Sequence, residues 1–202
     1  MAAEVTDKTQ NTGEQDPAIW QVAEEREVYT YKPWMEIYMQ DINLPDGRLI
    51  HNYGRIKLPD YISVFAQVPD GRVIVERQYK HGVGFVSLVL PSGMIEPGEE
   101  PIEAAKRELM EETGYRCDSW QPLGEFITNG NYGCGKGHFF LAKNAVPVGE
   151  PDNNDLEDME ILLITVEDLL TAIAQGQVAT TGAVAAISLA HMALSGSISL
   201  PE

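Results

Sequence analysis

Short apolar runs and partial apolar–polar alternation dominate the first half of the chain and predict strands there. Segments 28–31, 34–42 and 48–56 are rich in β-branched and aromatic residues. Pro45-Asp46-Gly47 separates the last two segments and predicts a hairpin turn. Because a sheet this small needs packing partners, we expect residues 18–59 to pack on the rest of the chain or on another subunit. Residues 1–17 are polar and aperiodic, and they predict a mobile tail.

The main domain, residues 60–202, begins where the pattern changes to strands interspersed with helices. The predicted strands are 61–68, 72–77, 86–90, 120–127, 138–142 and 161–166, and the later helices are 167–174 and 182–194. A glycine-rich loop is expected at 128–137, either as a phosphate cradle or as a surface loop. An acidic loop is expected at 149–160.

Charge and cysteine content narrow the classes of function. The formal net charge is −17, from 31 acidic and 14 basic residues, which argues against a nucleic-acid binder and favours a small anionic substrate whose charge is met by metal ions. Cys117 and Cys134 form no metal-ligand spacing and indicate free thiols of a reducing compartment. The start has no apolar signal core, and the longest apolar run is too short for a bilayer, so we expect a cytoplasmic protein without a membrane partner.

The segment 93–115, GMIEPGEEPIEAAKRELMEETGY, predicts a loop followed by a helix. Pro101 suits the first helical position, and Gly114 suits a left-handed C-cap. Ile102, Ala105 and Leu109 recur at helical spacing and predict a buried face.

Three carboxylates share one side of this predicted helix. Glu108, Glu111 and Glu112 are three and four residues apart, so their like charges repel by a few tenths of a kcal/mol, roughly. A solvated acidic face is one interpretation. A hard divalent cation is the other, because Mg²⁺ takes oxygen ligands from carboxylates and substrate phosphates.

The wider pattern favours the cation. The segment fits G-x5-E-x7-R-E-U-x-E-E-x-G-U at every fixed position, where U is a bulky apolar residue. It resembles the Nudix box, the signature of the Nudix hydrolases. The resemblance implies an α/β/α sandwich with a mixed sheet, here preceded by a small N-terminal β-region. It also implies hydrolysis of nucleoside diphosphates linked to another moiety, with Mg²⁺ or Mn²⁺ as cofactor.

Carried over by position, the resemblance implies roles for the box residues. Glu108 and Glu112 would be the principal metal ligands, assisted by Glu111. A carbonyl of Ser92 or Gly93 would be a further ligand. The remaining box positions, Glu99, Arg107 and Gly114, would be structural, with Glu99 and Arg107 pairing to hold the loop on the helix.

Segments beyond the box resemble the ADP-ribose pyrophosphatase branch, whose leading strands exchange between two subunits of a homodimer. Trp34 and Tyr53 would then stack on the base, unless they pack within the hairpins. Lys57 and Lys80 would meet phosphates, unless they are solvated surface charges. Glu157 in the acidic loop would be the general base, unless it too is solvated.

One position departs from that branch. Asn129 stands where a proline is usual, and the acidic residue usual a few positions later is replaced within 134–137. A nucleotide sugar other than ADP-ribose is therefore an alternative substrate. A non-catalytic nucleotide-sugar-binding or interaction module is an alternative function, and the acidic balance disfavours an mRNA-decapping enzyme.

Overall fold

The computed structural model describes residues 18–152 and 159–200, and the chain divides into two compact units, Met1–Ile56 and Lys57–Glu202. The predicted mobile tail, 1–17, lies outside the described residues.

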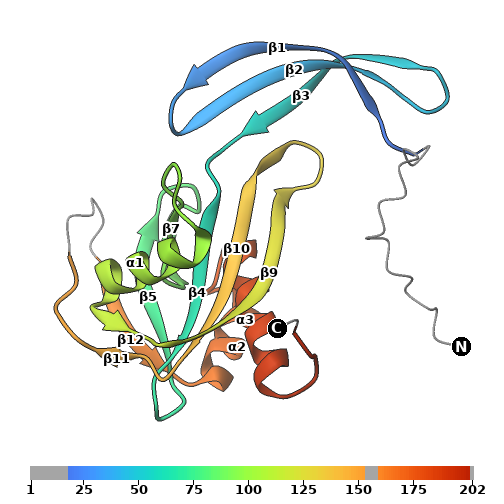
Figure 1. Ribbon diagram of the computed structural model, residues 1–202. Coiled ribbons are helices and arrows are strands. Elements are labelled where there is room, and N and C mark those ends of the chain that lie inside the picture. The colour runs from blue at the N-terminus through green and yellow to red at the C-terminus, as the bar shows by residue number, and fades with distance from the viewer. Residues whose placement is uncertain (1–17, 153–158, 201–202) are drawn as a thin grey trace, which may run out of the picture. The chain divides into compact units, whose positions relative to one another are not determined.

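The first unit is a sheet of β1 (Gln21–Tyr31), β2 (Met35–Asn43) and β3 (Leu49–Lys57), in that order (Figure 1). The turn predicted at Pro45-Asp46-Gly47 is present: the Leu44 N–H donates to the Arg48 carbonyl at 2.8 Å. β1 begins well before residue 28, where the apolar pattern placed it. Its first half is polar and exposed, and antiparallel pairing with β2 rather than burial supports the strand.

The second unit contains a mixed sheet. Its main path runs β10-β4-β5-β12, with β9 beside β10, β6 beside β5 and β7 beside β4. β10 is parallel to β4. β9 is antiparallel to β10, β5 is antiparallel to β4, β6 and β12, and β7 is antiparallel to β4. These strands are β4 (Tyr61–Gln67), β5 (Val73–Lys80), β6 (Phe85–Val89), β7 (Ser92–Met94), β9 (Ser119–Asn129), β10 (Gly133–Lys143) and β12 (Met159–Ile164). A separate small ladder joins β8 (Tyr115–Arg116) to β11 (Val146–Pro147).

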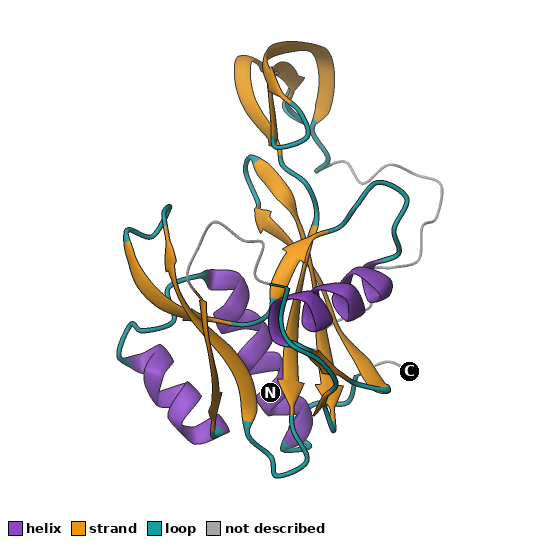
Figure 2. Ribbon diagram, turned by 90° about the vertical axis from the view of Figure 1, so that its left-hand side faces the viewer, coloured by secondary structure: helices purple, strands orange, loops and turns teal. Residues whose placement is uncertain are grey.

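Helices cover both faces of this sheet (Figure 2). α1 (Pro101–Thr113) buries Ala105 and Leu109 against Ile62, Ile74 and other residues of one sheet face. α2 (Val166–Ala174) and α3 (Thr181–Leu194) pack on the opposite face, where Leu169 and Ile187 join a second apolar cluster. The predicted α/β/α sandwich with a mixed sheet is therefore confirmed.

β4 and β5 diverge from the turn that joins them. They form a single residue pair, Gln67 with Val73, and beyond it β4 pairs with β7 while β5 pairs with β6. The widening between the two strands is thus occupied by β6 and β7, which lead into the box segment.

The prediction of a glycine-rich loop at 128–137 was wrong. β9 continues to Asn129 and β10 starts at Gly133, so most of this segment is a paired hairpin. A register shift between Gly133 and Lys136 accommodates the glycines, and Cys134 adopts a φ of 61° there. Val166, expected to end a strand, instead begins α2, because Thr165 caps that helix by accepting from the Asp168 N–H.

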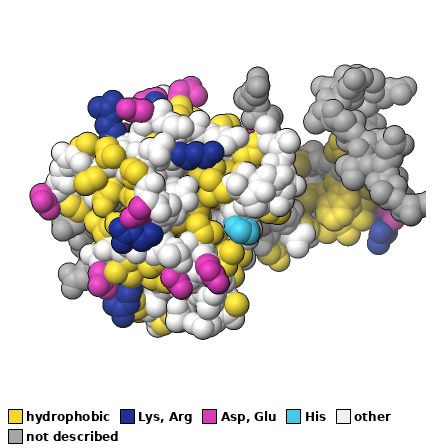
Figure 3. All heavy atoms as spheres, turned by 90° about the horizontal axis from the view of Figure 1, so that it is seen from below, with side chains coloured by type: hydrophobic (Ala, Val, Ile, Leu, Met, Phe, Trp, Pro, Cys, Tyr) yellow, Lys and Arg dark blue, Asp and Glu magenta, His cyan; other side chains and the backbone are white. Residues whose placement is uncertain are grey.

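The surface of the molecule mixes side-chain types. Figure 3 shows side chains of both charge signs scattered among apolar ones on the face it presents. Within residues 18–152 and 159–200, no helix has the length and apolar character needed to cross a membrane.

Candidate functional site

The box loop is fastened to α1 by an ion pair. Arg107 donates from Nε and Nη2 to the two carboxylate oxygens of Glu99, both at 2.9 Å, and Nη2 also reaches the Met94 carbonyl at 3.1 Å. Glu99 in turn accepts from the Glu96 N–H. The hydrogen bond from Arg107, and to a smaller extent the one from the Glu96 N–H, keep the pKa of Glu99 below its ordinary value.

The helix that carries the carboxylates begins and ends as the sequence predicts. Pro101 stands at its first position, and Gly114 closes it with a φ of 71° while its N–H donates to the Met110 carbonyl. A glycine is needed at this C-cap because a Cβ there would strike the Gly149 carbonyl as well as adopt a strained φ.

Glu108 and Glu111 converge on the same arginine. Arg107 Nη1 donates to Glu108 at 2.7 Å and to Glu111 at 3.1 Å. Burial raises the pKa of Glu108, and the bond from Arg107 partly offsets this. The Glu108 carboxylate lies so close to Gly93 that a Cβ at position 93 would overlap it. The loop backbone and this carboxylate are therefore in direct contact.

Glu112 takes a different partner. Its Oε2 accepts from the Ser92 N–H at 2.8 Å, which joins α1 to β7. Burial is the main cause that raises the pKa of Glu112 to about 10, and the charge of Glu76 is the second. The hydrogen bond from the Ser92 N–H and the charge of Lys80 lower this pKa and so offset part of the rise. The box carboxylates thus divide into a pair on Arg107 and one on the β7 backbone.

Glu76 is a carboxylate near the site that the sequence analysis missed. It is 0% exposed on β5, and Gln78 donates to its Oε2 at 3.0 Å. Its signal in the sequence is the alternation of VIVERQYK, which places Glu76 on the same strand face as Ile74, under α1. A carboxylate on that face is buried and approaches Glu112.

The donor set fits a hard divalent cation. Glu76, Glu108 and Glu112 concentrate negative charge in a partly buried region, and this crowding contributes to the raised pKa of Glu112. Carboxylate and carbonyl oxygens are the ligands that Mg²⁺ and Mn²⁺ prefer. In the described part of the chain, no group of three or more such side chains already converges on one point. A cation would therefore compete with Arg107 for Glu108.

The other predicted residues lie in different parts of the chain. Trp34 follows β1 in the first unit and is 49% exposed. Tyr53, on β3, meets Trp20 edge-to-face at 5.8 Å between ring centroids. Lys57 ends β3. Glu157 lies outside the described residues.

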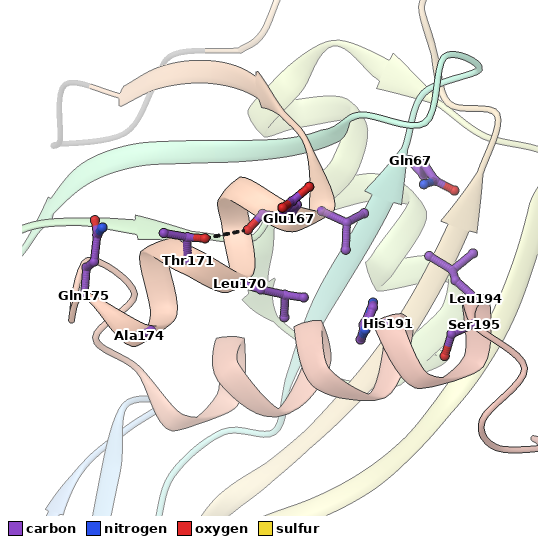
Figure 4. Close-up of a pocket in the computed structure, with 10 residues that line it drawn as sticks. Gln67, Glu167, Leu170, Thr171, Ala174, Gln175, His191, Leu194 and Ser195 are labelled. Atoms are coloured by element: carbon purple, nitrogen blue, oxygen red, sulfur yellow. Dashed lines mark hydrogen bonds between the residues drawn. The ribbon is translucent and has the colours of Figure 1, made fainter.

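Two cavities matter for the assignment of the site. One of about 330 Å³ is lined by Lys80 and Ser92 together with the start of α3, and so adjoins the Glu112 carboxylate. A larger one of about 940 Å³ lies between α2 and α3, where Leu170, His191 and Leu194 line it (Figure 4). Because Ser92, whose N–H donates to Glu112, and Lys80 line the smaller cavity and neither lines the larger one, the smaller one is the candidate substrate site.

Fold and site together define an α/β/α protein with an acidic helix beside a diverging sheet. A family model described as NUDIX domain matches residues 57–181. The chain belongs to the Nudix family.

Individual proteins extend the comparison. An ADP-ribose pyrophosphatase of Bacillus subtilis (strain 168) is 29% identical over 145 residues, which cover 71% of this chain and 78% of that protein. The methanol dehydrogenase activator of Bacillus methanolicus is 27% identical over 133 residues, covering 63% and 71%. The crystal structure of an ADP compounds hydrolase superposes with a TM-score of 0.78 at 20% identity, covering 91% of this chain and 98% of that one, which shows the shared fold.

Proposed function

We propose that the protein hydrolyses the pyrophosphate bond of a nucleotide sugar, with ADP-ribose as the first candidate and Mg²⁺ or Mn²⁺ as cofactor. The observation that carries the proposal is the buried Glu112 carboxylate, joined to the Ser92 amide at 2.8 Å and crowded by Glu76. Likeness to ADP-ribose pyrophosphatases over most of the chain supports the same substrate class.

The residues have distinct roles in this proposal. Glu108 and Glu112 hold the cation with Glu111 assisting, and a carbonyl of Ser92 or Gly93 completes the oxygen set. When bound, a divalent ion neutralises the charge of the diphosphate and acidifies a nearby water. The Glu99–Arg107 pair and the Gly114 cap act only by holding the loop and the helix in place.

The reaction balances without a further reactant. Glu157 accepts a proton from water, the water oxygen attacks one phosphorus, and the bond from that phosphorus to the bridging oxygen breaks. Two phosphate monoesters result, which for ADP-ribose are AMP and ribose 5-phosphate. Lys80 meets the phosphates from β5, and its effect on Glu112 supports a position beside them.

We assign Trp34 and Tyr53 to the base and Lys57 to the phosphates, and we place the protein in the cytoplasm as a homodimer. Exposed apolar side chains of the first unit support a dimer: Val22, Tyr29 and Tyr31 are 54%, 50% and 59% exposed. Surfaces of this kind mark protein–protein interfaces. Sedimentation at equilibrium tests the oligomeric state, and a monomer at micromolar concentration contradicts it.

A second candidate function is a module that binds a nucleotide sugar without turnover. It is favoured by the contacts of Arg107 with Glu108 and Glu111, which give both carboxylates a partner without an ion.

Glu112→Gln separates the two functions. The amide keeps an oxygen for the Ser92 N–H, so folding should be retained, while metal-dependent release of AMP should fall at least about 100-fold. The matched control is Glu103→Gln, at an exposed carboxylate of the same helix that pairs with Lys106. A panel of nucleoside diphosphate sugars, dinucleotides and capped RNA with Mg²⁺ identifies the substrate. Equal turnover by Glu112→Gln and the parent removes Glu112 from the mechanism, and no turnover of any substrate by the parent favours the module.

A further inference from the structure

A third cavity, of about 300 Å³, lies beside α1 and away from the box carboxylates. Its walls come from α1, β8, the link after β8 and the start of β9, through Lys106, Met110, Arg116, Cys117, Asp118 and Trp120. Each residue of an α-helix is turned by about 100° from the one before, so Lys106 is about 200° from Glu108 around the axis. The cavity therefore lies on the opposite side of α1 from Glu108, and none of the three box carboxylates is among its lining residues.

The lining of this cavity is rich in positive charge. Lys106 and Arg116 both line it, whereas one lysine lines the cavity of about 330 Å³. Among the described residues, no lysine or arginine lines the cavity of about 940 Å³. The whole chain has 14 basic against 31 acidic residues, so two cations in one small lining stand out against its net charge of −17. They favour an anionic ligand.

Both cations have weak partners of their own. Arg116 reaches Asp118 at 3.4 Å, and these two side chains are 71% and 90% exposed. Lys106 meets Glu103 at 2.7 Å, again between exposed side chains. Exposed ion pairs contribute little stability, so either cation can turn to a ligand at small cost. A phosphate offers both of them stronger, charge-assisted hydrogen bonds.

Trp120 provides a fixed aromatic wall. Its indole N–H donates to the Cys117 carbonyl at 2.7 Å, and its ring meets Phe140 edge-to-face at 6.4 Å between ring centroids. These two contacts hold the ring before any ligand binds, which lowers the entropic cost of stacking on it. Met110 adds a partly exposed, polarizable thioether to the same lining. A tryptophan ring and a thioether suit a flat aromatic group such as a nucleobase.

Size and charge narrow the ligand to a mononucleotide. The volume lies at the lower end of the roughly 300–1,000 Å³ usual for ligand sites, which suits one nucleotide better than a nucleotide sugar or a dinucleotide. A phosphate monoester carries about −1.5 to −2 charges at pH 7, and so matches two cations, whereas a carboxylate matches one. Asp118 adds an acceptor for a ligand hydroxyl or amino group.

We propose that this cavity is a second nucleotide site, which binds a nucleoside monophosphate with its base against Trp120 and Met110 and its phosphate between Lys106 and Arg116. The site is separate from the candidate substrate site beside Ser92. The proposal does not depend on the proposed function, although AMP would be a product of that reaction and would then bind away from the box carboxylates.

Tryptophan fluorescence tests the site without turnover. The chain has three tryptophans, and Trp20→Phe together with Trp34→Phe leaves Trp120 as the only one. AMP added to this metal-free full chain should quench the Trp120 emission to saturation. Ribose 5-phosphate and inorganic phosphate should not quench it, because they lack a base. Adenosine should bind at least about tenfold more weakly than AMP, because it lacks the phosphate.

Two further substitutions in the same background test the cations. Lys106→Ala and Arg116→Ala should each weaken AMP binding about tenfold, the loss expected for one charge-assisted hydrogen bond. Arg48→Ala is the matched control, because Arg48 is 69% exposed, pairs with Asp46 two residues away and lines none of the three cavities. It should leave the AMP affinity unchanged. All these side chains are exposed, so the melting temperatures should stay close to that of the background protein.

The outcomes that overturn the assignment are distinct. One is no quenching by AMP, and another is an AMP affinity unchanged in both Lys106→Ala and Arg116→Ala. A third is adenosine binding as tightly as AMP. Glu112→Gln should keep the AMP affinity, because Glu112 belongs to the other site, and a loss there would place AMP beside Ser92 instead.

Hydrolysis of ADP-ribose with Mg²⁺ by the parent is measured separately. If the parent hydrolyses ADP-ribose and AMP does not quench Trp120, the second site fails and the proposed function stands. If AMP quenches Trp120 as expected and the parent hydrolyses nothing, the proposed function fails and the second site stands.

Discussion

The Ser92 backbone N–H donates a hydrogen bond to the Glu112 carboxylate at 2.8 Å. This bond connects the last of the three glutamates on the box helix to β7. This single bond sets Glu112 apart from Glu108 and Glu111, which share Arg107. Glu112 is therefore the box carboxyl group that is bonded to a backbone amide and not to an arginine.

Metal binding should release protons. The pKa of Glu112 is raised to about 10 by burial and by Glu76, so the metal-free protein keeps a proton there at pH 7. A cation must displace it, and affinity should rise with pH by up to about tenfold per unit between the ordinary carboxyl pKa and 10. Calorimetry with Mn²⁺ in two buffers of different ionisation enthalpy measures the release. Glu112→Gln should abolish it, and equal proton release by both proteins contradicts the assignment.

Replacing Arg107 should lower the free energy of unfolding. Arg107→Met leaves Glu99 and Glu108 partly buried without their cation, and we expect a loss of about 1–3 kcal/mol in the free energy of unfolding. Urea denaturation measures it. Arg116→Met is the control, because Arg116 is 71% exposed and reaches Asp118, itself 90% exposed, at 3.4 Å. A surface pair of this kind contributes little, so similar losses in the two variants would contradict a structural role for Arg107.

Loss of the Glu99–Arg107 ion pair should lower the stability of the fold at acidic pH. The folded pKa of Glu99 lies below its ordinary 4.5, so its stabilisation is complete above pH 4.5 and is lost as the pH falls through the folded value. The melting temperature of the parent should exceed that of Glu99→Gln at pH 7, and the difference should shrink toward pH 3. Glu103→Gln should show no such trend, and a difference that is constant with pH rejects this explanation.

Trp34 should act in binding. Trp34→Ala is expected to raise KM for base-containing substrates more than it lowers kcat, because stacking on the base contributes to the ground state and the transition state alike. Steady-state kinetics with ADP-ribose measure both constants. Leu49→Ala, at an exposed apolar residue of the same unit, is the control, and unchanged KM in Trp34→Ala limits Trp34 to packing.

Local signals in the sequence predicted what depends on local chemistry. Pro101, Gly114 and the apolar spacing of Ala105 and Leu109 fix the box helix and its register, and the Glu99–Arg107 contact appears as the resemblance implied. The sandwich of layers was implied by the resemblance to the Nudix family, and the structure confirms it.

What depends on distant partners was not predictable. The glycines of 133–137 look like a loop, yet parallel pairing of β10 with β4 brings Gly137 opposite Tyr61 and extends the strand. Glu76 looks like an ordinary charged strand residue until α1 covers it.

The single residue pair between β4 and β5 affects the spacing of the strands beneath the box helix. An unbroken sheet separates its two helical layers along its whole length. In this sheet β4 and β5 diverge, and β6 and β7 lie between them. Since β4 and β5 pair only beside the Pro69-Asp70-Gly71 turn, the separation of their other ends depends on the pairing of β7 with β4 and of β6 with β5, and not on hydrogen bonds between β4 and β5 themselves. A substitution in β6 or β7 can therefore change the spacing beneath α1 without touching any box carboxylate.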